Sequence, residues 1–320
     1  MFAKVLDKAV ALVDSRFLLV AFFPVIVFVA AGALLLARLD SSALSRIEMT
    51  WTGWSGPQKW TTAVAGVAAL FILAYLVYVS VTPITRFFEG YFGPVAWVGE
   101  LLDLGRAPSR ITAKSSKRLR RSLTPPEPQA DGKTPSTDNK KEDPLAYRKH
   151  PGDADHFPTR LGNSLRAAEI HPRNAYGMDS VLLWPALVAK MGDATRKSID
   201  AARMALDFLV VISAASFTYA LFAAVAIAVE HAGRVFWAFV VLGSAGVGYV
   251  SYCGAVAAAR DYGDQVRTAF DLHRFALLQA LRLPLPMNPP EERRLWKEVN
   301  EIVRSNEPTD WWIFEHPPAE

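Results

Sequence analysis

The chain contains one cysteine, Cys253, among 320 residues, and it lacks the short motifs that mark most enzyme active sites. A single cysteine excludes an intramolecular disulfide and any zinc site built on paired thiolates. The sequence contains no glycine-rich phosphate loop after a strand, no GxSxG motif and no HExxH motif. We therefore expect that the protein is not an enzyme, and we assign it no catalytic residue, cofactor or metal.

Histidine and acidic side chains are also too scattered to indicate a metal site. The densest group lies in HPGDADH, residues 150–156, with His150, Asp153, Asp155 and His156. This stretch ends a proline-rich segment and has no regular element to fix ligand geometry, so we interpret it as part of a linker. His171 and His273 are more typical of packing or surface positions than of acid–base groups.

Charge is missing from four long apolar segments, residues 17–37, 61–82, 208–229 and 235–259. Each holds about twenty residues or more, and at 1.5 Å per residue this matches the roughly 30 Å of a bilayer's hydrocarbon layer. The pattern predicts an all-α integral membrane protein with four transmembrane helices. The first segment follows Lys4, Lys8 and Arg16, but it is longer than a signal peptide's apolar core, and we expect an uncleaved anchor.

The distribution of basic residues predicts the orientation of these helices. The region between the second and third apolar segments carries 20 of the 35 Lys and Arg residues, whereas the two remaining loops carry few. Because loops rich in Lys and Arg stay in the cytoplasm, we expect both termini on the cytoplasmic side. The outer loop, residues 38–60, contains Trp51, Trp54 and Trp60, which are typical of an interfacial aromatic belt.

Composition divides the chain into five regions. Residues 1–106 hold the first transmembrane pair and an interfacial helix at 85–104, broken near Gly93 and Pro94. Residues 107–156 are rich in Pro, Ser and Lys and predict a disordered cytoplasmic linker, whose run Lys114–Arg121 either binds anionic lipid or is solvated. No fold suited to nucleic acid accompanies that run. The regions 157–192, 193–282 and 283–320 predict a helical segment, a second transmembrane pair with a stalk, and a cytoplasmic tail.

Residues 157–191 combine an apolar stripe with a small group of polar side chains. Leu161, Leu165 and Ala168 share one face of a predicted helix, and a turn at 174–177 precedes an N-cap at Asp179 or Ser180. The next stretch, VLLWPALVA, is too short to span a bilayer and suits an interfacial position. A candidate polar cluster, which a lipid-modifying enzyme would require, consists of Arg160, Arg166, Glu169 and Asp179.

Two charged stretches flank the third and fourth apolar segments with mirrored spacings. If the chain folds at residues 230–234 as an antiparallel hairpin, every acidic residue of one charged stretch lies opposite a basic residue of the other stretch. The two residue numbers of each facing pair then add up to the same value. This register predicts an ion-pair ladder along a cytoplasmic stalk of two helices. Pairing within each helix, solvated faces and a vestibule lining are the alternatives. The ladder consists of Asp193, Arg196, Asp200, Arg203 and Asp207 on one side, and Arg260, Asp264, Arg267, Asp271 and Arg274 on the other.

Hydroxyl groups are the main polar feature inside the third and fourth apolar segments. Small residues at helical spacing favour close helix packing, and a pore lined by hydroxyls in an oligomer is the alternative. The candidate pore-lining residues are Ser213, Ser216, Ser244 and Ser251.

The stretches PTRLGNSLRAAE, YGMDSVLLWP and DYGDQVRTAFDLHRFALLQALRLPLP resemble segments of an uncharacterised family of bacterial four-helix integral inner-membrane proteins. The resemblance implies a bacterial inner membrane and transfers no functional residue. Together these features predict a non-enzymatic protein that binds a cytoplasmic partner or self-associates as a scaffold, with an oligomeric channel as the alternative. A predicted helix at 291–305 offers Leu295, Val299 and Ile302 for docking a partner or for packing on its own stalk.

Overall fold

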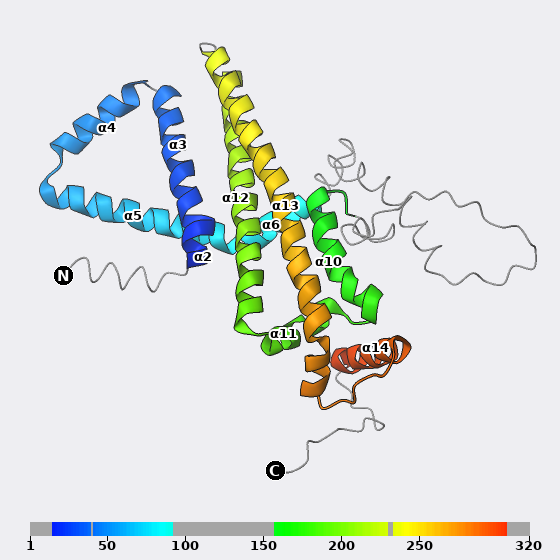
Figure 1. Ribbon diagram of the computed structural model, residues 1–320. Coiled ribbons are helices and arrows are strands. Elements are labelled where there is room, and N and C mark those ends of the chain that lie inside the picture. Colours follow the sequence, from blue (N-terminus) through cyan, green and yellow to red (C-terminus); the bar gives the residue numbers. More distant parts are fainter. Residues whose placement is uncertain (1–14, 40, 92–156, 230–232, 306–320) are drawn as a thin grey trace, which may run out of the picture. The chain divides into compact units, whose positions relative to one another are not determined.

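The computed structural model describes residues 15–39, 41–91, 157–229 and 233–305, and within these ranges it contains helices and no strands. The elements follow one another as in Figure 1. They are α2 (Ser15–Phe17), a π-helical turn (Leu18–Phe22), α3 (Phe23–Leu39), α4 (Ser41–Gly53), α5 (Gly56–Val79), α6 (Val81–Glu89), α10 (Arg160–Tyr176), α11 (Ser180–Lys190), α12 (Asp193–Val229), α13 (Arg234–Ala280) and α14 (Pro289–Ser305).

Four of these helical stretches are long enough and apolar enough to cross a membrane, as the hydropathy predicts. They are Ser15–Arg38, Gly56–Val79, Asp193–Ala228 and Arg234–Ala280. The last two continue well beyond the apolar runs into charged sequence without a break in the helix. The all-helical class and the four apolar helices are therefore confirmed.

The boundaries near the first pair differ from those predicted. Residues 41–53, expected as part of a loop, form α4, in which hydroxyl side chains bond back to carbonyls one turn earlier, as Thr50 does to Arg46 at 2.7 Å. Helix α5 begins at Gly56 rather than 61, since the Gln58 side chain accepts the Ser55 backbone N–H at 2.9 Å. The expected interfacial helix begins earlier, as α6.

Several predictions concern residues outside the described ranges. These are the linker at 107–156 with its basic run at 114–121, the HPGDADH stretch, and the part of the interfacial helix beyond residue 91. Within the described part, α6 ends where Gly90 adopts a φ of 93°, a left-handed conformation that favours glycine. The Gly93–Pro94 pair, where the sequence suggested a break, lies outside the described residues.

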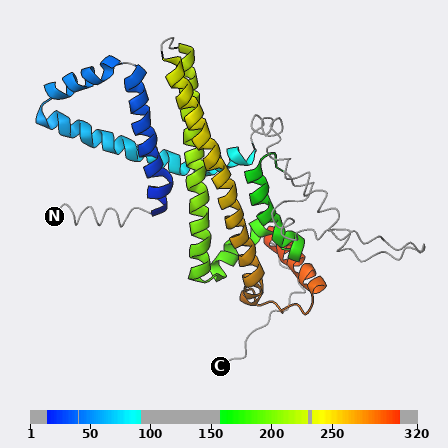
Figure 2. The same ribbon diagram turned by 45° about the horizontal axis from the view of Figure 1, so that its top comes forward.

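The chain divides into two compact units, each built from two stretches of sequence. Unit 1 comprises Met1–Thr85 and Met204–Ala255, and unit 2 comprises Arg86–Arg203 and Val256–Glu320. Helices α12 and α13 contribute to both units, and they are the two longest helices among the described residues (Figures 1 and 2).

In unit 1, the apolar parts of α12 and α13 pack closely through small residues. The Ser213 hydroxyl donates to the Gly248 carbonyl at 2.9 Å, and Gly254 lies against the Leu209 side chain. These contacts pair rising residue numbers on α12 with falling numbers on α13, so the two helices run in opposite directions here. Trp237 is buried with Ala223 and Ala226 at the end nearest the connecting segment.

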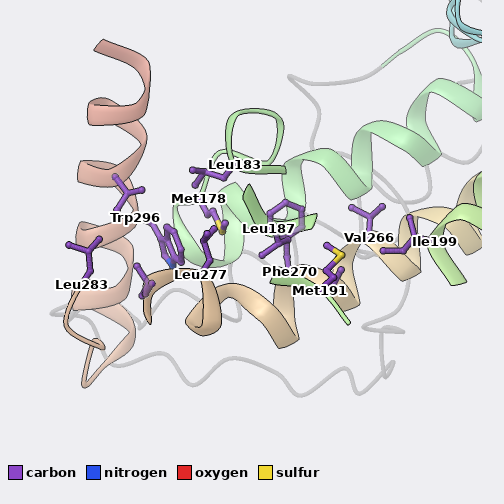
Figure 3. Packing of buried hydrophobic residues seen from close by; sticks show 13 residues of the cluster. Met178, Leu183, Leu187, Met191, Ile199, Val266, Phe270, Leu277, Leu283 and Trp296 are labelled. Carbon is purple, nitrogen blue, oxygen red and sulfur yellow. The ribbon is translucent and has the colours of Figure 1, made fainter. Parts of the chain in front are cut away.

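Unit 2 has its own apolar core, drawn in Figure 3. Leu187 of α11, Phe270 and Leu277 of α13, and Trp296 and Val299 of α14 are each at most 2% exposed. Met178, in the turn between α10 and α11, lies beside Trp296 and Leu277 in this view. Burial of such large side chains contributes about 1.5–3 kcal/mol each, so the core holds these helices together as one body.

The end of α6 is joined tightly to the start of α10. The Thr159 hydroxyl donates to the Glu89 carbonyl at 2.9 Å, and the rings of Tyr91 and Phe157 lie 4.9 Å apart. At Gly162, a Cβ atom would lie only 2.4 Å from the Glu89 carbonyl oxygen. The end of α6 and the start of α10 are therefore held beside each other by a contact that requires glycine.

We expect Gly162→Ala to destabilise unit 2 by about 1–3 kcal/mol, because the added methyl group forces the α6–α10 contact apart. Thermal unfolding of the purified protein measures this change. Gly192→Ala is the matched control, since a Cβ atom there meets nothing within 4 Å. Equal unfolding temperatures for the two variants would contradict the close contact.

Candidate functional site

The predicted ladder residues make several different kinds of contact. Arg267 pairs with Asp264 on its own helix, and the Arg203 guanidinium lies 5.5 Å from the centre of the Tyr262 ring. Tyr262 is two residues from Asp264, the position predicted to face Arg203. In unit 1, the buried Asp207 carboxylate pairs with Arg16 at 2.5 Å. The pairing of facing rungs across the two helices stays a prediction.

Asp271 of α13 is the centre of a polar group that the sequence did not indicate. Its Oδ1 atom accepts the Tyr176 hydroxyl at 2.7 Å and lies 3.0 Å from Nε2 of His171. Both partners come from α10, and all three side chains are half-buried. The carboxylate thus fixes α10 against α13 through two contacts. We call this group the Asp271 clasp.

Arg274, one turn further along α13, extends the clasp to α14. Its Nε atom donates to the Glu292 carboxylate at 2.8 Å, and Glu292 is only 7% exposed. The same guanidinium lies 4.2 Å from the centre of the Tyr176 ring and also contacts the backbone carbonyl of Asp271. Because guanidinium carries its charge at all accessible pH values and bonds carboxylates through a planar fork, it suits this joining position.

The clasp changes the acidity of Tyr176. Burial is the largest cause that raises its pKa, followed by the hydrogen bond to Asp271 and the charge of that carboxylate, and the pKa reaches about 12. The phenol therefore stays protonated at neutral pH and acts as a hydrogen-bond donor. This arrangement suits structural support, since a general base near neutrality requires a pKa close to the working pH.

Helix α14 is held to the same body by side-chain contacts, some of them to backbone groups. Asn300 donates to the Gly177 carbonyl at 2.8 Å and accepts the Asp179 N–H at 3.0 Å. Arg304 pairs with the Asp179 carboxylate at 3.0 Å. Of the two roles expected for the apolar stripe of this helix, packing on its own chain is the one seen, since Val299 is fully buried and Leu295 packs on the core.

The four residues of the candidate polar cluster do not form one group, and the contacts seen for them are separate. Arg166 and Glu169 pair at 2.8 Å, three residues apart as their spacing predicts. Asp179 is the N-cap of α11, as predicted, and accepts the N–H groups of Val181 and Leu182. The Asp179 carboxylate also pairs with Arg304 of α14. Arg160 is the first residue of α10 and is half-buried.

A second group of charges surrounds the α6–α10 contact, and we call it the charged joint. It consists of Arg86 and Glu89 of α6, Arg166 and Glu169 of α10, and Arg203 of α12. Burial raises the pKa of Glu89, whereas Arg203 and then Arg86 lower it and Glu169 raises it. Burial also raises the pKa of the neighbouring Tyr91, with Glu89 and Glu169 adding to the effect.

The candidate pore-lining serines are used largely for helix packing. Ser213 is fully buried and donates to Gly248 on the facing helix, and Ser244 donates to the Val240 carbonyl on its own helix at 2.5 Å. Ser251 is buried and Ser216 is half-buried. Their positions favour close packing of α12 and α13, which was the first interpretation of these residues.

The described ranges contain no group of three or more His, Cys, Asp or Glu side chains arranged to hold a metal ion. Comparisons with protein families, with curated proteins and with solved structures give no significant match to this chain. The resemblance to a bacterial four-helix inner-membrane family therefore remains an expectation from the quoted motifs.

We expect Tyr176→Phe to destabilise unit 2 by about 1–2 kcal/mol, because a half-buried hydrogen bond to a carboxylate is lost. Because the pKa of Tyr176 is raised, its phenol contributes fully to the free energy of unfolding below pH 10.0. This contribution is lost as the pH rises toward about 12, where the phenol of the folded protein ionises. Ultraviolet titration of tyrosinate in both proteins tests this, since their difference spectrum should have a midpoint near 12. A midpoint near 10 would show that Tyr176 is not in the clasp.

Proposed function

We propose that the chain is an integral protein of the bacterial inner membrane, with both termini in the cytoplasm and unit 2 outside the bilayer. The four apolar helices support membrane insertion, and the concentration of Lys and Arg between the second and third of them supports the orientation. The family resemblance supports the inner membrane. On this proposal, the charged ends of α12 and α13 form an antiparallel cytoplasmic stalk.

Within this arrangement, unit 2 serves as a rigid platform for a cytoplasmic protein partner, and no catalytic step is assigned to it. The observation that carries the proposal is the exposed, charged side of α12 opposite its buried one. Ile199 is buried in the core, whereas Asp193, Arg196 and Asp200 are exposed. These residues recur three and four apart, so they form one face of the helix, which we call the stalk face.

The stalk face is a better candidate for partner binding than the apolar stripe of the tail. Deleting the tail removes Trp296 and Val299 from the core, and losing the Trp296 side chain alone costs about 3–5 kcal/mol. Tail deletion would therefore disturb the whole unit and could not identify a docking surface. Buried Ser213 and Ser251 also favour this platform over an oligomeric channel, because a pore would need their hydroxyls exposed.

We expect a photo-crosslinking amino acid in place of the exposed Lys197 to capture one discrete partner in living cells. The double reversal Asp193→Lys and Asp200→Lys should abolish the adduct, because it inverts the charge of the stalk face. Glu301→Lys, at an exposed position of α14, is the matched control and should leave the adduct intact. An adduct that survives the double reversal, or the lack of any adduct, would contradict the platform.

A further inference from the structure

Helix α4 is a short helix that its own sequence and its described contacts do not explain. It spans Ser41–Gly53, and five of its thirteen residues are serine or threonine, which favour helix only weakly. Every described side chain of α4 is exposed. Isolated helices of this length are marginal in water, and most helices in proteins are stabilised by burying an apolar face. Helix α4 therefore needs an apolar surface that its described contacts do not supply.

Three large apolar side chains form a stripe along one side of this helix, and we call them the α4 stripe. Ile47 and Trp51 are 63% and 43% exposed, and their spacing of four residues makes them neighbours on the helix. Trp54 follows the helix end, and the centre of its ring lies 5.8 Å from that of Trp51. Met49, which is 66% exposed, lies on the other side. The sequence placed the two tryptophans in an interfacial loop, whereas the helix aligns Trp51 with Ile47.

The side of α4 opposite the stripe is polar and carries no net charge. Two residues turn an α-helix by about 200°, so Ser45 lies opposite Ile47, and Thr52 shares the side of Ser45 because it is seven residues away. The hydroxyls of Ser45 and Thr52 donate to backbone carbonyls of the preceding turn at 2.8 and 2.9 Å. Arg46 and Glu48 are the two ionic residues of the helix, and their charges cancel.

The connections of α4 place it at the surface of a membrane. It lies between two candidate spans, Ser15–Arg38 and Gly56–Val79. It begins two residues after α3 ends and ends three residues before α5 begins. A link of three residues reaches at most about 11 Å, so both ends of α4 lie close to the ends of spans. In the orientation proposed above, this is the boundary between the outer leaflet and water.

We propose that α4 lies flat on the outer leaflet, with the α4 stripe inserted between the lipids and the side of Ser45 and Thr52 facing water. An interfacial helix is held by burial of its apolar side and, where it is charged, by attraction to lipid headgroups. Because α4 has no net charge, its insertion depends on the space between the lipids. The helix thus responds to lipid packing and not to lipid charge. The inference rests on the membrane placement proposed above and is independent of the partner on the stalk face.

The test measures how often a nitroxide label collides with oxygen, which concentrates in lipid, and with a nickel chelate, which stays in water. The full-length protein with Cys253→Ser is placed in dioleoylphosphatidylcholine liposomes and labelled at Ile47→Cys or Ser45→Cys. We expect oxygen collisions to dominate at position 47 and nickel collisions at position 45. Ile72→Cys, at a 62% exposed position of α5, is the reference for a lipid-facing residue of a span.

A pair of substitutions separates the stripe from the polar side of the same helix. Trp51→Ser should lower the ratio of oxygen to nickel collisions at position 47, because it removes one of the inserted side chains. Thr52→Ala is the matched control and should leave this ratio unchanged. An equal ratio in the two variants would contradict insertion through the stripe.

Lipid composition tests the response to packing. Cholesterol tightens the packing of the bilayer and should lower the ratio of oxygen to nickel collisions at position 47 relative to position 72. Replacing part of the phosphatidylcholine by dioleoylphosphatidylglycerol should leave the ratio unchanged. A ratio that follows phosphatidylglycerol and not cholesterol would show that charge holds the helix, against the proposal.

The label at position 72 distinguishes failure of this inference from failure of the membrane placement. If position 72 is accessible to oxygen while positions 47 and 45 are equally open to nickel, the span stands and α4 does not insert. If the label at position 47 is shielded from both reagents, protein such as a second copy covers the stripe, which also overturns the proposal. Nickel access at position 72 would contradict the membrane placement itself, and the lipid contact of α4 with it.

Discussion

The change from apolar to charged sequence within single unbroken helices is the constraint on which the rest of the structure depends. An α-helix satisfies its own backbone hydrogen bonds, so α12 and α13 can continue from an apolar solvent into water without a loop. The division between the two compact units falls at residues 203/204 and 255/256, close to the innermost ladder charges, Asp207 and Arg260. Both units are therefore built on the same two helices, which are charge-free over most of their length in unit 1 and carry apolar and charged faces together in unit 2.

Within unit 2, α13 contacts α10, α11, α12 and α14. Phe270 and Leu277 supply its part of the apolar core, while Asp271 and Arg274 hold α10 and α14 from the same stretch of helix. Apolar burial supplies most of the stability, and the partly buried Arg274–Glu292 pair contributes mainly orientation, because the cost of removing both charges from water offsets much of their attraction. A core with a polar group at its edge specifies one arrangement of these helices.

Local patterns predicted much of this fold, and long-range contacts account for what they missed. The four charge-free runs, the N-cap at Asp179 and the Arg166–Glu169 pair all depend on residues close in sequence. The attachment of His171 and Tyr176 to Asp271 depends on side chains about 100 residues apart. A ladder that repeats every seven residues also cannot indicate whether a rung pairs with its own helix, with the facing helix or with a third element, as Asp271 does.

Cysteine labelling tests the membrane arrangement most directly, because the chain has only Cys253 to remove. In a Cys253→Ser background, Ser45→Cys lies at an exposed position of α4 and Glu301→Cys at an exposed position of α14. With a membrane-impermeant maleimide on spheroplasts, the arrangement predicts immediate labelling at position 45 and labelling at position 301 only after permeabilisation. Labelling at position 301 in intact spheroplasts would contradict it, and unit 2 could not then be a cytoplasmic platform.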